Sequence, residues 1–494
     1  MHDKRPLVHD VQPVIASYPV GPGPAPDRNA LLLALPPIKS DDEWLEQLAV
    51  EPAFDESQLA DEAYLRSYYV SNLKDFFIPA ERGRHLARRL DQLIRHGLAS
   101  RNPLAGGHFR LLQQDYAEVQ RSGKPRKLVF SKLRPICSFS LIGVSGMGKS
   151  TTIEAVLAAY PQYILHKELD LHQLVWLKVE CPKDGSVKEL ALNILRAFDA
   201  VLGTTHAPRV SRSVTLDMLM SLVKQLARAH CLGVLVLDEL QNVSVRKSGG
   251  REELLNWFQE LVNELKLPLV VLGTFKARAV LQLDARHSRR AGVMGGATWR
   301  PLDRGAEFDL LIETLWSYQW LREPGELTDQ FKDTVYGETQ GVVAFIVDMF
   351  LVCQLHALSH AKETLTPAMF HHVARQEFEF LQPLLNALRS KQPNRLAKFE
   401  DVDAYDIDDI IQKQQQLIPQ GTPARPDGKP GPSLLVRAAA MVRSTLGLSD
   451  TEARRLVESV LTPGHKSHTK LTQDALAAWF RAQGTGEDGL ADAA

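Results

Sequence analysis

A glycine-rich loop constrains this chain more than any other stretch. Residues 141–152 read LIGVSGMGKSTT, which contains the spacing G-x-x-x-x-G-K-S. Glycines at this spacing let the backbone curl with its N–H groups inward, and the start of a following helix adds further phosphate donors. The apolar residues 139–144 predict a strand before the loop, and residues 153–160 predict a helix after it. The loop is therefore predicted to bind the phosphates of a nucleotide.

The motif predicts a role for each residue of the loop. Lys149 is expected to reach the β- and γ-phosphates, and the Ser150 hydroxyl is expected to ligate Mg²⁺. The residues predicted to hold ATP are Gly143, Ser145, Gly146, Met147, Gly148, Lys149, Ser150 and Thr151. ATP and Mg²⁺ are thus the expected cofactors.

Composition sets the class of protein. The chain has 494 residues, 44% of them hydrophobic and 24% charged, which is ordinary for a globular protein of several domains. Its net charge is −1, so any binding to nucleic acid has to come from local patches. The four cysteines have no metal-ligand spacing, and neither a transmembrane stretch nor a secretory signal is evident. We expect a cytoplasmic protein that does not bind membranes.

The order of apolar and polar segments predicts six parts. A Pro-rich flexible tail (1–38) precedes a helical N-terminal region (39–120), an α/β nucleotide-binding core (121–305), a helical lid (306–391), a linker (392–432) and a helical C-terminal module (433–494). Within the core, continuous Val- and Leu-rich strands alternate with helices. This pattern is typical of a parallel sheet covered by helices on both faces.

Two further strand ends carry candidate catalytic groups. Residues 234–239 read VLVLDE, an apolar strand followed by two carboxylates, which is the Walker B arrangement. Asp238 is expected to complete the Mg²⁺ site, and Glu239 to orient and polarise the attacking water. Residues 269–274 read LVVLGT, so Thr274 is placed to contact the γ-phosphate or the water. The alternative for Thr274 is a plain helix N-cap.

Arginines follow the next predicted helix, in the stretch RHSRR at 286–290. Arg289 and Arg290, with Arg286 next, are candidates for an arginine finger that enters the site of a neighbouring subunit. A solvated basic turn or a DNA contact is the alternative for each of them.

Two basic segments are candidates for contacts with a phosphate backbone. The first contains Lys124, Arg126, Lys127 and Lys132, and the second contains Arg246, Lys247 and Arg251. For the first segment, a solvated hairpin edge is an equally good interpretation. Neither segment shows an aromatic stacking pattern or a groove-reading helix, so binding to double-stranded DNA would be sequence-tolerant.

Taken together, these motifs resemble an AAA+ ATPase, and in detail the TnsC/TniB family of transposition regulators. The stretches that carry the resemblance are 141–150, 237–242 (LDELQN), 272–277 (LGTFKA), 339–343 (TQGVV), and Gly97 followed by RNP at 101–103, so that it spans about residues 64–380. In AAA+ terms, Thr274 holds the place of sensor 1. One departure is that residues 337–350 contain no arginine, so a sensor 2 arginine is not evident.

The resemblance implies a function. Such proteins form homo-oligomeric rings or helical filaments around double-stranded DNA, with residues 244–251 expected to line the pore. They link a target-selection protein of the TnsD/TniQ type to transposase subunits, and ATP hydrolysis disassembles the polymer. The alternative is a signalling ATPase of the STAND type, or a secretion-associated ATPase of the ExeA type, acting through protein partners without DNA.

Overall fold

The computed structural model describes most of the chain. Described are residues 11–18, 29–79, 81–99, 101–103, 138–183, 186–207, 214–243, 250–281, 294–360, 363–390, 407–419 and 448–462, with scattered positions in 113–121 and 435–479. The chain divides into two compact units. The first takes in Met1–Ala49 and Pro79–Arg300, and the second Val50–Ile78, Pro301–Gln392 and Asp401–Ala494.

A five-stranded parallel sheet forms the centre of the first unit, in the order β5-β6-β7-β2-β8. Its strands are β2 (Ser138–Gly143), β5 (Trp176–Glu180), β6 (Val234–Asp238), β7 (Leu269–Gly273) and β8 (Met294–Trp299). Every residue of β2, β6 and β7 is buried, which explains why β6 and β7 read as continuous apolar runs. The predicted α/β fold with a parallel sheet is confirmed.

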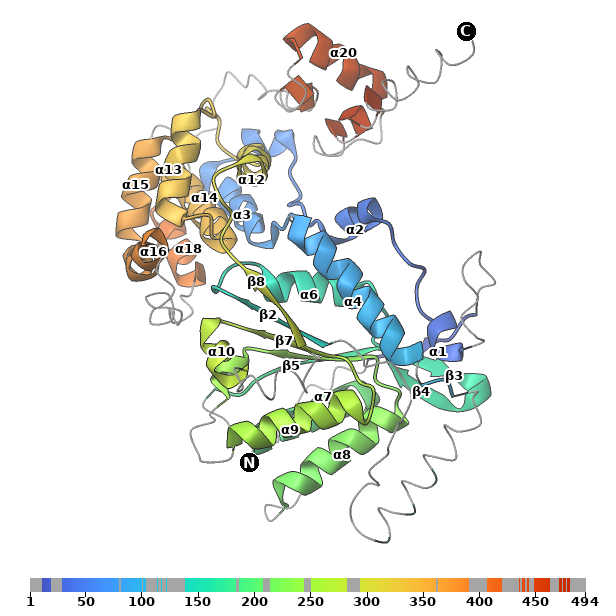
Figure 1. Ribbon diagram of the computed structural model, residues 1–494. Coiled ribbons are helices and arrows are strands. Elements are labelled where there is room, and N and C mark those ends of the chain that lie inside the picture. The colour runs from blue at the N-terminus through green and yellow to red at the C-terminus, as the bar shows by residue number, and fades with distance from the viewer. Residues whose placement is uncertain are drawn as a thin grey trace, which may run out of the picture. The chain divides into compact units, whose positions relative to one another are not determined.

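Helices cover both faces of this sheet (Figure 1). On one side lie α7 (Val187–Leu202), α8 (Leu216–Ala229) and α9 (Gly250–Asn263), and on the other α2 (Asp41–Leu48), α4 (Glu81–Ala99) and α6 (Lys149–Ala158). The ends of α7 follow its sequence: the Ser186 side chain caps its first turn, and Gly203 with φ of 68° ends it.

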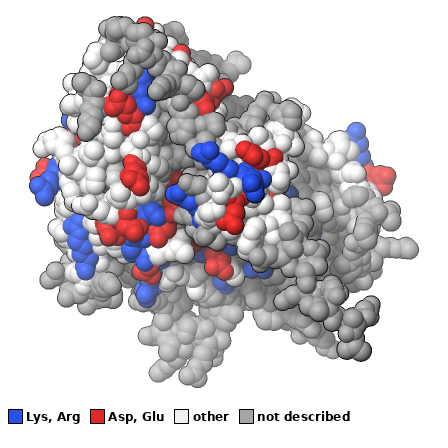
Figure 2. Space-filling model, turned by 90° about the horizontal axis from the view of Figure 1, so that it is seen from above, with Lys and Arg blue, Asp and Glu red and all other residues white. Residues whose placement is uncertain are grey.

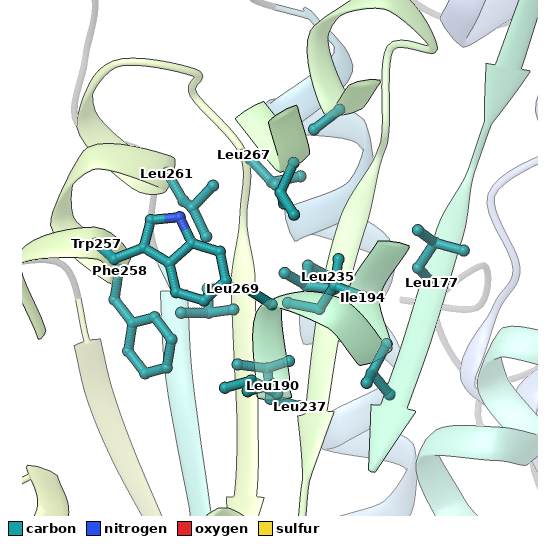
Figure 3. Close-up of a cluster of buried hydrophobic side chains, with 14 of the residues drawn as sticks. Leu177, Leu190, Ile194, Leu235, Leu237, Trp257, Phe258, Leu261, Leu267 and Leu269 are labelled. Atoms are coloured by element: carbon teal, nitrogen blue, oxygen red, sulfur yellow. The ribbon is translucent and has the colours of Figure 1, made fainter. Parts of the chain in front are cut away.

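The core on the α7 side is closely packed (Figure 3). Leu190 and Ile194 of α7 meet Leu235 and Leu237 of β6, and Trp257 of α9 closes the cluster. All five side chains are fully buried. Each contributes about 1.5–3 kcal/mol relative to an exposed position, so this layer fixes the strands that carry the site.

A small second sheet joins the N-terminal residues to the first unit. β1 (Val14–Ile15) pairs in parallel with β3 (Tyr163–His166), and β4 (Leu171–Leu174) pairs with β3 in antiparallel fashion after the short turn η3 (Lys167–Leu169). Asn29 caps α1 (Ala30–Leu33), and its amide nitrogen donates to the Leu98 oxygen at 3.0 Å. The segment predicted as a flexible tail therefore contains two short elements bound to the core.

A largely buried helix, α14 (Val343–Leu358), organises the second unit, with α3, α15 and α18 packed on it. The remaining elements are η1 (Glu56–Ala60), α3 (Ala63–Val70), η2 (Ser71–Asp75), α12 (Ala306–Trp316), α13 (Asp329–Thr339), α15 (Pro367–Gln376), η5 (Glu379–Leu381), α16 (Gln382–Arg389), α18 (Ile407–Gln416) and α20 (Asp450–Val460). Ala453 and Val457 of α20 are buried with Ala439, Val442 and Leu471.

The units differ from the predicted boundaries in two places. The predicted N-terminal region 39–120 is divided, because α2 and α4 contact α6 whereas α3 contacts α14. Inside the predicted linker 392–432, α18 is a regular helix whose Ile411 and Gln414 are buried. Helical periodicity shows which face of a helix is apolar but not which partner covers it.

The described helices include no single one long and apolar enough to cross a membrane. Only α13 and α14 taken together reach that length and hydropathy, and a bend of 117° separates them. The cysteines at 181, 231 and 353 are buried free thiols.

Candidate functional site

The glycine-rich loop connects β2 to α6 as its sequence predicts. Gly146 and Gly148 have φ values of 78° and 75°, a left-handed backbone that L-residues rarely adopt. Gly143 is required for a different reason, since a Cβ there would lie 2.6 Å from the Trp299 carbonyl oxygen on β8. Glycine at these positions therefore lets the loop curl while β2 and β8 stay in register.

Lys149 is the first residue of α6 and is buried. Its amine donates hydrogen bonds to the backbone oxygens of Gly143, at 2.9 Å, and Val144, at 2.8 Å. Ser145 and Thr151 are exposed, and Ser150 is half-buried. The loop therefore holds the lysine amine close to its own backbone, with hydroxyl groups open to solvent beside it.

The Walker B carboxylates follow at the end of β6. Asp238 is buried, and its Oδ2 lies 3.0 Å from the amine of Lys178 on the neighbouring strand β5. That amine also contacts Glu154 of α6, at 2.7 Å. Glu239 has a φ of 56°, and its N–H donates to Asp238 Oδ1 at 2.9 Å. An ion pair thus holds Asp238, while its neighbour turns away from the strand.

The surroundings of Glu239 shift its pKa. Burial, and then the charge of Asp238, raise the pKa of Glu239 above its ordinary value, although Lys149 and a hydrogen bond from Gln241 act in the opposite direction. Burial alone would lower the pKa of Lys178, but its hydrogen bonds to Glu154 and Asp238 raise it, so this lysine stays charged. A carboxylate with a raised pKa is a better proton acceptor near neutral pH.

Thr274 directly follows β7 and precedes α10 (Phe275–Leu281). It is 4% exposed, and its hydroxyl oxygen has no hydrogen-bond partner within the described part of the chain. The alternative of a helix N-cap needs an acceptor bond at this hydroxyl, and the structure shows none. A buried hydroxyl without a partner costs free energy, so this position fits a contact that a ligand supplies.

Sequence reasoning missed two residues of this site, Lys178 and Gln241. Gln241 lies in η4 (Leu240–Asn242), where its amide nitrogen donates to Glu239 Oε2 and its oxygen accepts from the Thr274 N–H at 3.0 Å. The stretch LDELQN contained the signal, but only the fold shows what the glutamine contacts.

The residues present fit ATP with Mg²⁺. Backbone N–H groups at the start of α6 and the Lys149 amine suit phosphate oxygens, and the Ser150 hydroxyl and Asp238 carboxylate are oxygen ligands of the kind Mg²⁺ takes. No group of three or more His, Cys, Asp or Glu side chains able to hold a metal occurs among the described residues. Mg²⁺ at nucleotides does not require such a group, because phosphates and water complete its coordination.

Other predicted site residues lie outside the described residues. They are Arg286, Arg289, Arg290, Lys124, Arg126, Lys127, Lys132, Arg246 and Lys247; for Arg251, only the backbone in α9 is described. On the face drawn in Figure 2, described Lys and Arg side chains lie among Asp and Glu side chains. The arginine finger and the DNA contacts therefore stay predictions.

Comparison with known proteins identifies the family that this core resembles. Residues 130–301 match the family described as Bacterial TniB protein, a range that includes all five strands of the parallel sheet. The predicted resemblance to the TnsC/TniB family is confirmed for these residues. No curated protein matches the chain.

Solved structures show similar folds at low identity. ORC1 of Aeropyrum pernix in complex with DNA is 15% identical over 77% of this chain and 94% of that chain, with a TM-score of 0.33. A Walker-type ATPase of Pyrococcus abyssi is 14% identical over 57% and 84%, with a TM-score of 0.32. AMPPCP-bound DnaA of Aquifex aeolicus is 15% identical over 77% and 91%, with a TM-score of 0.28. At these TM-scores the likenesses carry no argument.

Proposed function

We propose that this chain is an ATP-hydrolysing, DNA-binding regulator of transposition. It assembles on target DNA as a ring or helical filament and links a target-selection protein of the TnsD/TniQ type to transposase subunits. One observation carries the proposal: Lys149, Asp238 with Glu239, and Thr274 follow three adjacent strands of a sheet whose residues match the TniB family. Ligands of open α/β sheets bind at these carboxyl ends.

Each group has a distinct task in hydrolysis. Lys149 exchanges its two carbonyl partners for phosphate oxygens when ATP binds, and the backbone donors of the loop hold the remaining phosphate charge. Mg²⁺, held by Ser150 and Asp238, supplies further positive charge against the phosphates when bound. Glu239 accepts the proton of the attacking water, and the buried Thr274 hydroxyl donates to the γ-phosphate or the water.

Assembly and DNA binding rest on the family resemblance. Arg289 and Arg290 would complete the site from a neighbouring subunit, which makes hydrolysis dependent on the oligomer. The basic segments around Lys127 and Arg246 would contact phosphates of the duplex. Hydrolysis at a subunit interface then weakens the contacts that hold the polymer on DNA.

The variant Glu239→Gln tests this function. The amide keeps the shape of the side chain but accepts no proton, so turnover should fall about 10²- to 10⁴-fold while ATP affinity stays within about twofold. Phosphate release measures turnover, and electron microscopy with duplex DNA measures assembly. We expect DNA to stimulate hydrolysis by the wild-type protein, and polymers of the variant to persist on DNA in ATP.

Two results would contradict the proposal. A Glu239→Gln variant that stays monomeric with ATP and DNA would exclude the switch. Wild-type hydrolysis that is indifferent to DNA would favour the signalling or secretion-associated classes of ATPase. Lys188→Ala, at a half-buried position near the start of α7, is the matched control and should hydrolyse ATP as the wild type does.

A further inference from the structure

Gln241 makes two hydrogen bonds that link the residues at the carboxyl ends of β6 and β7. Its amide nitrogen donates to Glu239 Oε2, and its amide oxygen accepts from the Thr274 N–H at 3.0 Å. Glu239 follows β6 and Thr274 follows β7, and these strands are neighbours in the sheet. One side chain therefore spans from the proposed base to the residue proposed to sense the γ-phosphate.

The orientation of this amide follows from its partners. The Thr274 N–H is a donor and has to meet an oxygen, so the nitrogen of the Gln241 amide faces the other way, toward the Glu239 carboxylate. A carboxylate accepts only, which suits that nitrogen. This orientation satisfies both partners. A flipped amide would place its nitrogen against the Thr274 N–H and its oxygen against the carboxylate, and neither pair could form a hydrogen bond.

The surrounding backbone makes room for this bridge. A Cβ at Gly273 would lie 2.8 Å from the Gln241 amide oxygen and 2.6 Å from Ala277 Cβ. Glycine at the end of β7 therefore lets the glutamine approach the strand. On the other side, Leu240 is fully buried, and η4 contacts both β7 and α10. The turn that carries the glutamine is consequently held against β7 and α10.

We infer that Gln241 is a positioning residue, whose amide fixes the Glu239 carboxylate relative to Thr274 so that base and sensor act as one unit. This inference rests on the proposed ATP hydrolysis. It assigns Gln241 no contact with ATP, so its loss acts on the chemical step through Glu239. Displacement of a catalytic group by about 1 Å can lower a rate about 10²-fold.

Gln241→Met is the decisive variant, because methionine has a similar length and volume but makes neither hydrogen bond. We expect kcat to fall about 10- to 100-fold, with KM and the dissociation constant for an ATP analogue within about twofold of wild type. Gln241→Glu keeps an oxygen for the Thr274 N–H but offers Glu239 no donor, so its kcat should fall at least as far. Asn242→Leu removes an amide from the same turn and serves as the control with wild-type kcat.

A double variant separates positioning from a merely structural role. In single-turnover measurements, Gln241→Met added to Glu239→Gln should lower the residual rate by less than about twofold, because its effect passes through Glu239. Gln241→Met leaves the Thr274 N–H without its acceptor, at a cost of about 1–3 kcal/mol, so its thermal midpoint should fall by a few degrees, whereas loss of fold would lower the midpoint much further.

Three results would overturn the inference. They are a wild-type kcat for Gln241→Met, a full additional loss in the Glu239→Gln background, and a loss of ATP affinity and thermal midpoint in parallel with kcat. Absence of hydrolysis by the wild-type protein would remove the proposed function and the inference with it. Hydrolysis by the wild type with an unaffected Gln241→Met variant would remove the inference alone.

Discussion

A buried ion pair in the second unit gives a quantitative test of the structure. Arg66 of α3 is fully buried, and its guanidinium donates to both carboxylate oxygens of Glu363, at 2.6 and 2.7 Å. It also donates to the backbone oxygens of Trp320 and Asp61. Glu363→Gln keeps the shape of the acceptor but leaves the arginine cation without its counter-charge.

The expected cost follows from this geometry. Removing one partner of a buried ion pair costs about 3–5 kcal/mol. The Glu363 side chain is 16% exposed and Arg66 keeps two carbonyl acceptors, so we expect the unfolding free energy of this unit to fall by about 2–3 kcal/mol at pH 7. Urea unfolding followed by tryptophan fluorescence measures it, because Trp320 packs beside the pair.

The pH dependence gives a second readout. Burial alone would raise the pKa of Glu363, but the hydrogen bonds and charge of Arg66 hold it below its ordinary value. A lowered folded-state pKa means that the stabilisation is complete above the unfolded-state pKa, about 4.3, and is lost as the pH falls through the folded-state pKa. The difference between wild type and Glu363→Gln should therefore shrink as the pH is lowered below about 4.

Lys413→Met is the control for this experiment. It removes a surface ion pair with Glu377 in the same unit, and the lysine side chain is 63% exposed. Such pairs contribute about 0–1 kcal/mol. A Glu363→Gln variant within about 0.5 kcal/mol of wild type at pH 7, or one whose deficit does not change with pH, would refute the reasoning.

Two further predictions concern the nucleotide site. Thr274→Val removes a buried hydroxyl that has no partner among the described residues. The unfolding free energy should be unchanged or higher by up to about 1 kcal/mol, while ATP turnover falls. A destabilised variant with normal turnover would contradict this prediction. Gly143→Ala forces a methyl group against the Trp299 carbonyl and should cost about 1–3 kcal/mol and weaken ATP binding. Gly337→Ala, in open space within α13, is its control and should stabilise by about 0.5–1 kcal/mol. Thermal unfolding and titration with an ATP analogue measure all three variants.

Sequence periodicity predicted the elements that carry strong local signals. The helix predicted over 187–202 is α7, and the apolar run before Thr274 is β7. By contrast, β8 was not predicted, because its sequence MGGATW has too few large apolar residues for a strand signal. It forms because β2 offers a neighbouring edge, and Gly143 of β2 leaves room for the Trp299 carbonyl of β8. Pairing with β2, and not the local sequence, therefore determines that these residues form a strand.

The candidate site residues likewise fall into those that a sequence motif predicts and those that only the fold reveals. Lys149, Asp238, Glu239 and Thr274 were predictable because each follows a recognisable strand or loop. The contact of Lys178 with Asp238 was not predictable, since it depends on the register in which β5 pairs with β6. Lys178 pairs with Val236, two residues before Asp238, so both side chains share one face of the sheet and the long lysine reaches the carboxylate. A motif search finds neither this contact nor the contacts of Gln241.

The two missed residues give the adjacent carboxylates Asp238 and Glu239 different surroundings. Within the described part of the chain, Asp238 forms an ion pair with Lys178, whereas the Glu239 carboxylate accepts from the neutral amide of Gln241. Lys178 therefore places a positive charge against Asp238, the carboxylate proposed to ligate Mg²⁺. For Glu239, burial and the charge of Asp238 raise the pKa, and the charge of Lys149 only partly offsets that rise. Pairs of acids whose surroundings differ in this way divide metal binding from proton transfer. In this chain the difference in surroundings comes from Lys178 on β5 and Gln241 in η4.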